Sequence, residues 1–505
     1  ITTLLKEHKI RDVTFSLRHP HSAREFCVQY QESDFDFLQR LTAEEGIFYF
    51  FECSNGRNTL VFADDCGSVP PGIRLPYQPG ESSTLGEPAV NSLTSSAQIR
   101  PAQVQLKDYT FKNPAWPAEF SQQMRDENLQ QLYYEHYDYP GRFKDEAHGK
   151  DFTRYRLEAL RSDAMMGQGS GNAIALQPGK LFILTNHSRA DLNQSWQTVS
   201  TSHSGSQPGA LETASGGESG TTLHSHFYFI RQNQNWRPAL LAKPVMDGPQ
   251  IAKVVGPAGE EIFCDQYGRV RLQFPWDRYG KSDDQSSCWI RVSQPWAGQG
   301  WGMLAIPRIG QEVVVDFLHG DPDQPIVTGR TYHASNIPPG KLPGSKTQMA
   351  LRSKTHKGEG YNELLFEDAK GSEKLSLHAQ KDMYTKVLNN RDTHVIANHT
   401  ETVEKNQIIK INENKEETVT LNSTETVKEM RKLITGKNYI IEVGAHKAET
   451  ITNTLSITTG DVIELKCGAS VLRMDSSGKI TLKGSEFKFE ASGPVQITGK
   501  DIDLN

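Results

Sequence analysis

The feature that most constrains this chain is an eight-residue repeat in its C-terminal part. Valine or isoleucine returns at every eighth position, and after one interruption at Thr435 the repeat resumes in the same register. These residues, called the octad residues below, are Val387, Val395, Val403, Ile411, Val419, Val427, Val443 and Ile451. A period of eight fits neither the helical period of about 3.6 nor the heptad of a coiled coil. The spacing predicts short stacked strands joined by turns.

The composition of the repeat indicates that one chain cannot fold it alone. Turn-forming asparagine follows five octad residues after three positions, at Asn390, Asn398, Asn406, Asn414 and Asn422, and Asn438 follows Thr435 in the same way. One apolar side chain in eight does not offset the entropy lost when the other seven residues become ordered. Three chains around one axis would bury a ring of three octad side chains at each repeat and leave no open strand edge. We therefore expect a homotrimeric, triple-stranded β-helix or prism with the octad residues as its axial core.

The interruption at Thr435 leaves two structures open. A ring of three threonines inside such a shaft would hold water or ions. Alternatively, a local change of geometry would turn the neighbouring Ile434 inward in place of Thr435.

The charge distribution argues against binding to nucleic acid. The net charge is −6, and residues 385–460 carry ten Lys or Arg against ten Asp or Glu. Residues 255–340 hold seven basic and ten acidic side chains, whereas contact with phosphates requires a basic groove. We expect a soluble shaft, no nucleic-acid partner and no cofactor.

The six cysteines and the absence of long apolar runs indicate where the chain folds. The cysteines are widely spaced without a C-x-x-C pair, which is typical of reduced, packed thiols in a cytosolic protein. No apolar run approaches the roughly 18 residues that span a bilayer. The first residues, ITTLLKEHKI, show no signal-peptide core. We therefore expect cytoplasmic assembly and export without a cleaved signal.

The N-terminal half reads as a folded α+β region. Alternation through Phe26, Val28 and Tyr30 predicts a strand, and a capping-box-like Ser33 begins a helix with an apolar stripe at Phe35, Leu38 and Leu41, which ends at Gly46. A strand at 46–51 follows. Further along we expect a helix at 146–163, a strand at 181–185, a Ser/Gly-rich surface loop at 201–222 and a strand at 226–231.

Residues 253–334 contain five strand signals that favour a small closed barrel such as an OB-fold. The signals span Arg269–Phe274, Cys288–Val292, Met303–Ile306, Gln311–Leu318 and Ile326–Thr328. Prolines and glycines between residues 338 and 344 then indicate a linker before the repeat.

Several long motifs resemble the valine-glycine repeat protein G family, VgrG, the spike of the bacterial type VI secretion system. In the barrel region these are CDQYGRVRLQFPWDRYG at 264–280 and SSCWIRVSQPWAGQGWGMLAIPRIGQEVVVDFLHGDPDQPIVTGRTYH at 286–333. QYQESDFDFLQRLTAEEGIFYFF at 29–51 resembles the family's hub domain, and NELLFEDAKGSEKLSLHAQKDM at 362–383 resembles the start of its β-helix. Two departures are the absence of the first part of the hub and the use of Asn where the family usually has a glycine turn.

The resemblance implies a multidomain, mainly β protein with an α+β hub. We expect a phage-hub-like domain at 1–252, an OB-fold barrel at 253–338, a linker and the start of the β-helix at 339–384, and the trimeric β-helix or prism at 385–505. The family's role implies a homotrimer that sits on the tube protein Hcp and contacts baseplate components. A PAAR-repeat tip protein and effector toxins would ride on the distal shaft, and contraction of a sheath would drive the spike mechanically through a target membrane.

Other residue patterns favour structure over chemistry. Trp276, Trp289, Trp296 and Trp301 are more typical of packing than of ligand stacking. GQGSG at 167–171 lacks the lysine of a phosphate loop and is expected to be an ordinary loop, and the histidines of His19-Pro20-His21 and His224-Ser225-His226 have no third metal ligand in sequence. Asp321 and Asp323 fit an Asp-Pro turn. We expect no catalytic residue and no enzymatic activity.

Two alternatives remain open at the level of sequence. A phage tail spike or adhesin that binds or cleaves envelope polysaccharide also uses a trimeric shaft. The second alternative is a secretion spike that carries an enzymatic domain beyond residue 505.

Overall fold

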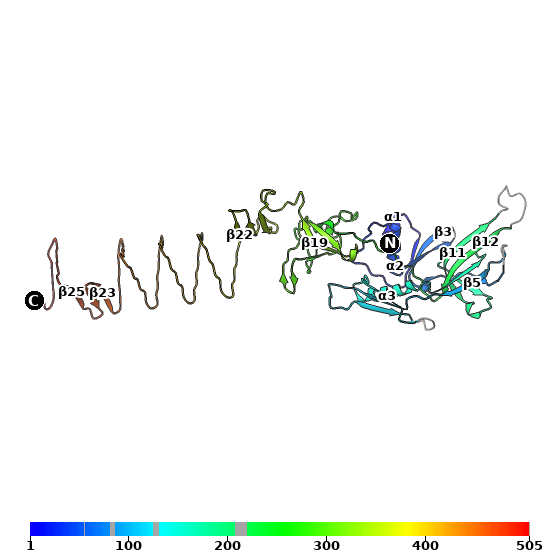
Figure 1. The fold of residues 1–505 in the computed structure, drawn as a ribbon, viewed down its shortest axis with the longest axis horizontal. Helices are drawn as coiled ribbons and strands as arrows, with labels where there is room; N and C mark the ends of the chain where they lie inside the picture. Colours follow the sequence, from blue (N-terminus) through cyan, green and yellow to red (C-terminus); the bar gives the residue numbers. More distant parts are fainter. Residues whose placement is uncertain (55, 81–85, 125–130, 208–219, 504–505) are drawn as a thin grey trace. The chain divides into compact units, whose positions relative to one another are not determined.

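The structure is a computed structural model that describes every residue except 55, 81–85, 125–130, 208–219 and 504–505. The chain divides into two compact units, Ile1–Asn389 and Asn390–Asn505 (Figure 1). The first unit contains the helices and most of the strands, and the second contains all octad residues except Val387.

An N-terminal α+β element combines two helices with a three-stranded sheet. The helices are α1 (Thr2–Glu7) and α2 (Asp34–Glu44), and the sheet order is β1-β3-β2. β1 (Val13–Ser16) runs parallel to β3 (Arg57–Ala63), and β2 (Phe48–Ser54) runs antiparallel to it. Leu5, Leu38, Ile47, Leu60 and Phe62 form its buried core.

The predicted limits of α2 are confirmed, but its predicted apolar stripe is wrong in part. Ser33 Oγ accepts a hydrogen bond from the backbone N–H of Asp36 at 3.1 Å, and Gly46, with φ of 68°, follows the helix. Leu38 is buried as expected, whereas Phe35 is 60% exposed. All buried positions of the helix come after Phe35, so its first turn is not packed against the core.

A six-stranded sheet of order β4-β10-β11-β12-β9-β5 follows. Its strands are β4 (Arg74–Pro76), β5 (Val90–Ala97), β9 (Met165–Gly171), β10 (Leu181–Thr185), β11 (Ser195–Ser206) and β12 (Thr222–Arg231). The strand predicted at 181–185 is confirmed as β10. The loop predicted at 201–222 is wrong at both ends, because residues 201–206 and Thr222 belong to the antiparallel pair β11 and β12. The middle of that loop, 208–219, lies outside the described residues.

The GQGSG segment at 167–171 is part of β9 and is not the loop that the sequence suggested. Its glycines give room to aromatic side chains of β12. A Cβ on Gly167 would lie 2.2 Å from the Phe229 ring, and one on Gly169 would lie 2.4 Å from the Phe227 ring. Glycine therefore serves here to let two buried rings pack directly against the backbone of a strand.

A third sheet, of order β7-β6-β8, carries the helix α3. The strands are β6 (Gln103–Lys107), β7 (Glu119–Gln123) and β8 (Glu135–Asp138). The helix predicted at 146–163 is confirmed as α3 (Glu146–Leu160), and its N-cap Asp145 accepts from the His148 N–H at 3.0 Å. The buried residues between helix and sheet are Val104, Leu106, Ala118, Phe143 and Leu157.

Five strands form a closed barrel, as the sequence predicted. The sheet order is β14-β13-β18-β19-β15, and paired backbone hydrogen bonds between Val270 and Ile290, 2.9 and 2.8 Å long, join its two ends. The strands are β13 (Gln250–Val255), β14 (Arg271–Gln273), β15 (Arg291–Val292), β18 (Glu312–Phe317) and β19 (Pro325–Thr331). The bridge therefore joins the two end strands of the sheet at one point.

Two details of the barrel differ from the prediction. The segment Met303–Ile306 is not a strand, and a short hairpin of β16 (Ala297–Gly298) and β17 (Trp301–Gly302) precedes it. β13 was missed because its outward side chain is Ile251, 41% exposed, while an inward position holds the small Ala252. The pattern of apolar residue sizes in β13 therefore does not indicate which face is buried.

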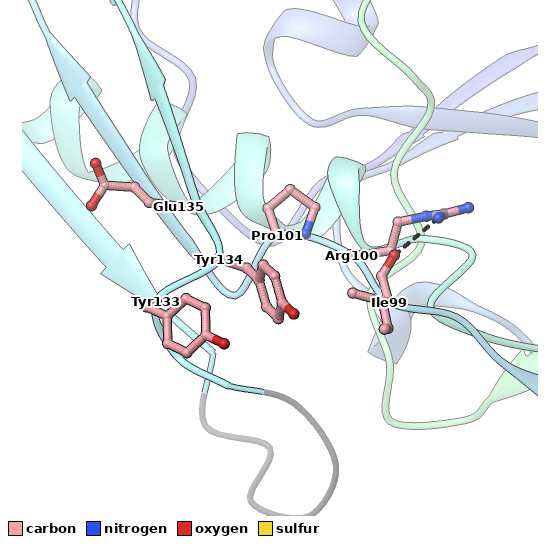
Figure 2. A pocket seen from close by; sticks show the side chains of 6 residues that line it. All are labelled: Ile99, Arg100, Pro101, Tyr133, Tyr134 and Glu135. Carbon is pink, nitrogen blue, oxygen red and sulfur yellow. Dashed lines mark hydrogen bonds between the residues drawn. The ribbon is translucent and has the colours of Figure 1, made fainter.

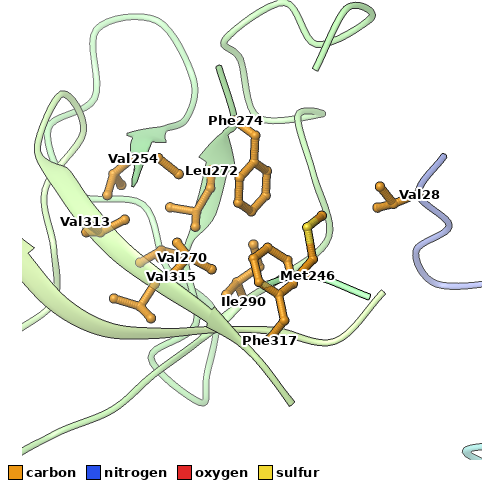
Figure 3. Close-up of a cluster of buried hydrophobic side chains, with 12 residues drawn as sticks. Val28, Met246, Val254, Val270, Leu272, Phe274, Ile290, Val313, Val315 and Phe317 are labelled. Carbon is orange, nitrogen blue, oxygen red and sulfur yellow. The ribbon is translucent and has the colours of Figure 1, made fainter. Parts of the chain in front are cut away.

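The barrel core also contains a residue from the N-terminal region. Figure 3 shows Val28, on a separate segment, on the side of the barrel core where Met246 lies. The backbone N–H of Val28 donates to Asp323 Oδ1 at 2.7 Å. The strand predicted around Val28 is wrong, because residues 26–30 are not assigned to a strand and pack on the barrel instead. The remaining buried core residues are Ala252, Val254, Val270, Leu272, Phe274, Ile290, Val313, Val315 and Val327.

Two three-stranded antiparallel sheets accompany the repeat. The first, in the N-terminal unit, consists of β20 (Gln348–Arg352), β21 (Glu363–Glu367) and β22 (Lys374–His378). The second, in the C-terminal unit, consists of β23 (Val462–Cys467), β24 (Ser470–Asp475) and β25 (Ile480–Lys483). Short 3₁₀ turns elsewhere span Cys66–Ser68, Ala190–Leu192 and Leu318–Gly320.

The described residues include no helix with the length and apolar character needed to cross a membrane. All six cysteines are free thiols, but they are not mostly packed as the sequence suggested. Cys66 and Cys288 are half-buried, and the exposed ones are Cys27, Cys53, Cys264 and Cys467.

The barrel core yields a test of the fold. Leu272→Ala removes a fully buried side chain, and we expect it to lower the free energy of local opening of the barrel by about 2–5 kcal/mol. Hydrogen exchange of peptides from β13, β14 and β18 measures this change. The control Leu318→Ala alters a side chain that is 42% exposed and should stay within about 0.5 kcal/mol of the unchanged chain. Equal exchange in both variants would contradict the core assignment.

Candidate functional site

The octad residues share one environment in the single chain. All eight are between 44% and 50% exposed, whereas other large apolar side chains of the repeat reach 93% at Ile396. The exposed fractions are 47% for Val387, 46% for Val395, 47% for Val403, 46% for Ile411, 49% for Val419, 48% for Val427, 50% for Val443 and 44% for Ile451. Equal exposure at eight sites means that the backbone repeats the same geometry around each of them.

The backbone itself keeps the eight-residue period. A bend occupies the two residues after each octad position, from 388–389 to 452–453, and the regular turns are visible in Figure 1. The bend at 436–437 follows Thr435 in the same way, so the period is unbroken where the sequence pattern lapses. Ile434 is 76% exposed and does not take an octad position in the single chain. Of the two structures considered above, this favours threonine at the octad position.

The repeat lacks the internal hydrogen bonds of an ordinary sheet. Across residues 381–460, all of which are described, no backbone N–H donates to a backbone carbonyl of the same chain. Every one of these residues is exposed. Folded proteins satisfy nearly all buried backbone groups, and an extended chain satisfies them through neighbouring strands. The geometry of this segment therefore suits pairing with strands that the single chain does not supply.

Alternate residues of one repeat line an open hollow. Glu401, Val403, Lys405 and Gln407 surround a volume of about 390 Å³ next to the bend at 404–405. Side chains at alternate positions of an extended chain point to one face. The octad residue Val403 is therefore flanked on its own face by polar and charged groups.

Polar pairs recur beside the octad residues on this face. Within one repeat, Lys415 Nζ lies 2.7 Å from Glu417 Oε2, and Glu417 stands two residues before Val419. Between consecutive repeats, Arg431 Nη2 lies 3.1 Å from Glu425 Oε2. The hydrogen bond from Lys415 lowers the pKa of Glu417. These pairs keep the flanking charges neutralised beside the apolar row, although fully exposed pairs add little to stability.

His21 is held between two carboxylates in the N-terminal element. Its Nδ1 lies 3.2 Å from Glu45 Oε2 and its Nε2 lies 3.2 Å from Asp64 Oδ2, with 15% of the side chain exposed. Both contacts are hydrogen bonds only when the ring carries two protons. The hydrogen bond with Glu45 is the largest effect and raises the pKa of His21, while burial acts in the opposite direction. Arg24 neutralises Glu45 from the other side at 2.7 Å.

The GDPDQP segment forms a buried ion cluster that the sequence reading missed in part. Asp321 Oδ1 accepts the backbone N–H of Asp323 at 2.9 Å, as predicted for an Asp-Pro turn. Lys243 Nζ also lies 2.5 Å from a carboxylate oxygen of each aspartate, and Asp323 receives the N–H of Val28. Lys243 had no recognisable signal in sequence because it lies far from the turn and in a Pro-rich stretch. The cluster is a structural tie between the barrel and the N-terminal segment.

The four barrel tryptophans fall into two groups. Trp276 stacks on Phe274 with ring centroids 4.8 Å apart, and Trp289 lies beneath the Arg271 guanidinium at 4.8 Å, which supports the packing role expected for them. Trp296 and Trp301 form an edge-to-face pair on the β16–β17 hairpin and are 64% and 58% exposed.

A shallow aromatic pocket lies in the N-terminal unit (Figure 2). It has a volume of about 410 Å³ and is lined by Ile99, Arg100, Pro101, Tyr133, Tyr134 and Glu135. The two tyrosine rings lie 4.9 Å apart, and Arg100 is held by Asp163 at 2.5 Å. The sequence did not predict this pocket, because two adjacent tyrosines next to a strand do not differ from the pattern of an ordinary strand edge.

At least one histidine of each sequence pair contacts another group of the chain. His19 Nε2 lies 3.6 Å from Asp65, and His226 Nδ1 lies 2.9 Å from the carbonyl of Gly169. Among the described residues, no group of three or more His, Cys, Asp or Glu side chains is arranged to hold a metal ion.

Three sequence families match consecutive parts of the chain. Residues 1–209 match "Phage tail baseplate hub (GPD)", and residues 264–332 match "Type VI secretion system/phage-baseplate injector OB domain". Residues 349–459 match "Bacteriophage T4 gp5 C-terminal trimerisation domain". The first two matches lie on the α+β sheets and the barrel, and the third begins at β20 and includes all the octad residues.

Two curated relatives align with most of the chain. The chain is 47% identical over 405 residues to "Actin cross-linking toxin VgrG1" and 45% identical over 408 residues to "Type VI secretion system spike protein VgrG3", both of Vibrio cholerae serotype O1. These alignments cover 80% and 81% of this chain. The chain belongs to the VgrG family. The sequence-based assignment is therefore confirmed.

The matched part is smaller than the VgrG relatives themselves. The chain spans 37% of VgrG1, 39% of VgrG3 and 52% of VgrG4b of Pseudomonas aeruginosa, to which it is 39% identical. The solved structure titled "The E. coli c3393 protein is a component of the type VI secretion system and exhibits structural similarity to T4 bacteriophage tail proteins gp27 and gp5" is 20% identical, with a TM-score of 0.43. That alignment covers 65% of this chain and 69% of the other.

The carboxylate contacts of His21 predict a pH dependence of stability. Because the folded pKa of His21 is raised above 6.5, its stabilising effect is complete below that pH and is lost as the pH rises through the folded pKa. We expect the free energy of unfolding to fall between about pH 6 and about pH 8, and His21→Gln to reduce this slope. Hydrogen exchange of α2 and β3 at both pH values measures it. His8→Gln, at an exposed histidine, is the control, and an unchanged slope in His21→Gln would refute the assignment.

Proposed function

We propose that this chain forms the trimeric spike of a bacterial type VI secretion system, mounted on the secretion tube and driven through target envelopes. The observation that carries the proposal is the repeat at 381–460, which is extended, regularly bent and without backbone partners in one chain. The match of residues 349–459 to a trimerisation domain supports three copies. The names of the VgrG relatives support the secretion setting.

A trimer would supply the repeat with partners for its backbone hydrogen bonds and with burial for its octad side chains. Two further chains supply strands for the unpaired backbone groups, and three half-exposed octad side chains meet at each repeat. Burial of the remaining half of each side chain stabilises the shaft by about 1 kcal/mol, so the octad residues together contribute on the order of 8 kcal/mol per chain. The octad residues Val387, Val395, Val403, Ile411, Val419, Val427, Val443 and Ile451 are the axial core in this proposal.

The proposed partners follow from the spike's place in the machine. The hub region would sit on the tube protein Hcp and contact baseplate components, and the distal shaft would carry a PAAR-repeat tip protein and effector toxins. Assembly would take place in the cytoplasm on the apparatus, followed by injection into a target cell. The relatives named as spike proteins support the role of a spike, on which these proposed partners depend.

We propose that the described part of the chain acts mechanically and carries no catalytic residue. The octad residues are apolar, and pairs of opposite charge flank Val419 and Val427, which suits a stiff shaft. The actin cross-linking in the name of VgrG1 refers to that relative, and this chain spans 37% of its length.

The oligomeric state tests the proposal. Light scattering of the purified chain at micromolar concentration should give three times the chain mass of 56.5 kDa. A monomeric mass would contradict the spike. A trimer that binds polysaccharide saturably, or releases reducing sugar from it, would instead support a phage tail spike or adhesin.

A single substitution tests the inward orientation of the octad residues. Val403→Asp would bring three carboxylates to one axis, where they cannot all ionise, and should cost the trimer several kcal/mol. The matched control is Thr402→Asp on the opposite face of the same strand. Thermal unfolding followed by circular dichroism should show a lower melting temperature for Val403→Asp and little change for Thr402→Asp. Equal melting temperatures would show that Val403 does not face the axis.

A further inference from the structure

Lys243 is enclosed between two aspartates at a site that excludes most water. Its Nζ lies 2.5 Å from Asp321 Oδ1 and 2.5 Å from Asp323 Oδ2. The exposed fractions of the Lys243, Asp321 and Asp323 side chains are 6%, 8% and 13%. Burial disfavours the charged form of an amine or a carboxyl group, so this site favours proton transfer between them. An amine and two carboxyl groups are thus held in contact away from bulk water.

The pKa values of the two carboxyl groups are shifted in opposite directions. Burial raises the pKa of Asp323, although Lys243 acts against this shift. Burial also acts on Asp321, but the charge and the hydrogen bond of Lys243 outweigh it, so the pKa of Asp321 is lowered. Two neighbouring acids whose environments separate their pKa values can serve as a protonated acid and a proton acceptor. Asp323 suits the first role and Asp321 the second.

The two oxygens of Asp323 have different partners. The backbone N–H of Val28 donates to Oδ1 at 2.7 Å, whereas Lys243 Nζ contacts Oδ2. Attack of an amine on the Asp323 carboxyl carbon would place negative charge on Oδ1, where a backbone donor already stands to stabilise it. The Asp323 N–H also donates to Asp321 Oδ1 at 2.9 Å and fixes the two acids relative to each other. This geometry has the parts of an acyl-transfer site.

The positions of Lys243 and Asp323 in the chain enclose most of the barrel. Lys243 precedes the first barrel strand, β13, and Asp323 directly precedes the last, β19. A covalent bond between them would close a ring of chain that contains β13, β14, β15 and β18. A pulling force between the residues before 243 and those after 331 would then pass through this bond and β19, and the four strands inside the ring would not bear it.

We propose that Lys243 and Asp323 form an intramolecular isopeptide bond, with Asp321 as the proton acceptor. Proton transfer from the Lys243 ammonium to the Asp323 carboxylate first gives a neutral amine and a neutral acid. Lys243 Nζ then bonds to Asp323 Cγ, and Asp321 takes a proton from the nitrogen and passes it to Oδ2. The Cγ–Oδ2 bond breaks and one water leaves, so the reaction needs no other reactant. The bond itself does not depend on the proposed trimer, but its mechanical benefit rests on the proposed function.

Mass spectrometry of the purified full chain tests the bond. The unfolded chain should be lighter than its sequence by the mass of one water. Trypsin should release a branched peptide that joins residues 232–253 to residues 309–330, and its fragments should place the link at Lys243 and Asp323. The same two peptides recovered only as separate linear chains would overturn the bond and leave the cluster as an ion pair.

Three substitutions separate the chemistry from the ion pairs. Lys243→Arg keeps a positive charge beside both aspartates, but its guanidinium stays protonated and should give no branched peptide. Asp321→Asn removes the proton acceptor at nearly constant size, and we expect at least about tenfold less branched peptide. The control Asp247→Asn changes an exposed acid of the same segment and should leave the yield unchanged. Hydrogen exchange of β13 and β18 shows whether each variant keeps the barrel.

The outcomes are distinct from those that test the proposed function. An unlinked chain that is trimeric in light scattering would overturn the isopeptide bond alone. A linked chain that is monomeric would overturn the spike and keep the bond. A branched peptide formed in full yield by Asp321→Asn would contradict the role of Asp321 as proton acceptor.

Discussion

The structure depends on where the backbone hydrogen bonds of residues 381–460 are made. These residues form no backbone pairs within the chain, and all of them are exposed. A backbone polar group that leaves water without a partner is costly, and an extended segment cannot satisfy its own groups as a helix does. The repeat thus needs strands from outside the chain, and its half-exposed octad residues mark the side on which other copies would bring them.

In the N-terminal unit, strands of the same chain supply one another with backbone hydrogen bonds. The hydrogen bonds between Val270 and Ile290 join the two end strands of the barrel sheet, so its five strands pair with one another within the chain. Val28 then joins the barrel core, and Asp323 binds both the Val28 N–H and the Lys243 ammonium. These contacts fasten the N-terminal segment to the barrel through buried groups, so the barrel core is completed within one chain.

Sequence reasoning succeeded where a pattern is local and failed where packing decides. The cap at Ser33 and the limits of α2 could be predicted, since an N-cap acts within one turn. Phe35 was misplaced because a helical stripe does not say which turn meets the core. The glycines of β9 looked like a loop because the Phe227 and Phe229 rings that need their space come from a distant strand. The Lys243 cluster was missed for the same reason.

The sequence by itself determined the period of the repeat, the barrel class and the family, because each depends on motifs of residues that lie close together in the chain. Only the tertiary structure decided that the bends stay in phase through Thr435, that Ile434 does not replace it, and that the Phe227 and Phe229 rings lie against the glycines of β9. The reason is physical. Strand register sets which side chains share a face, and register depends on pairing between strands that the linear order does not specify.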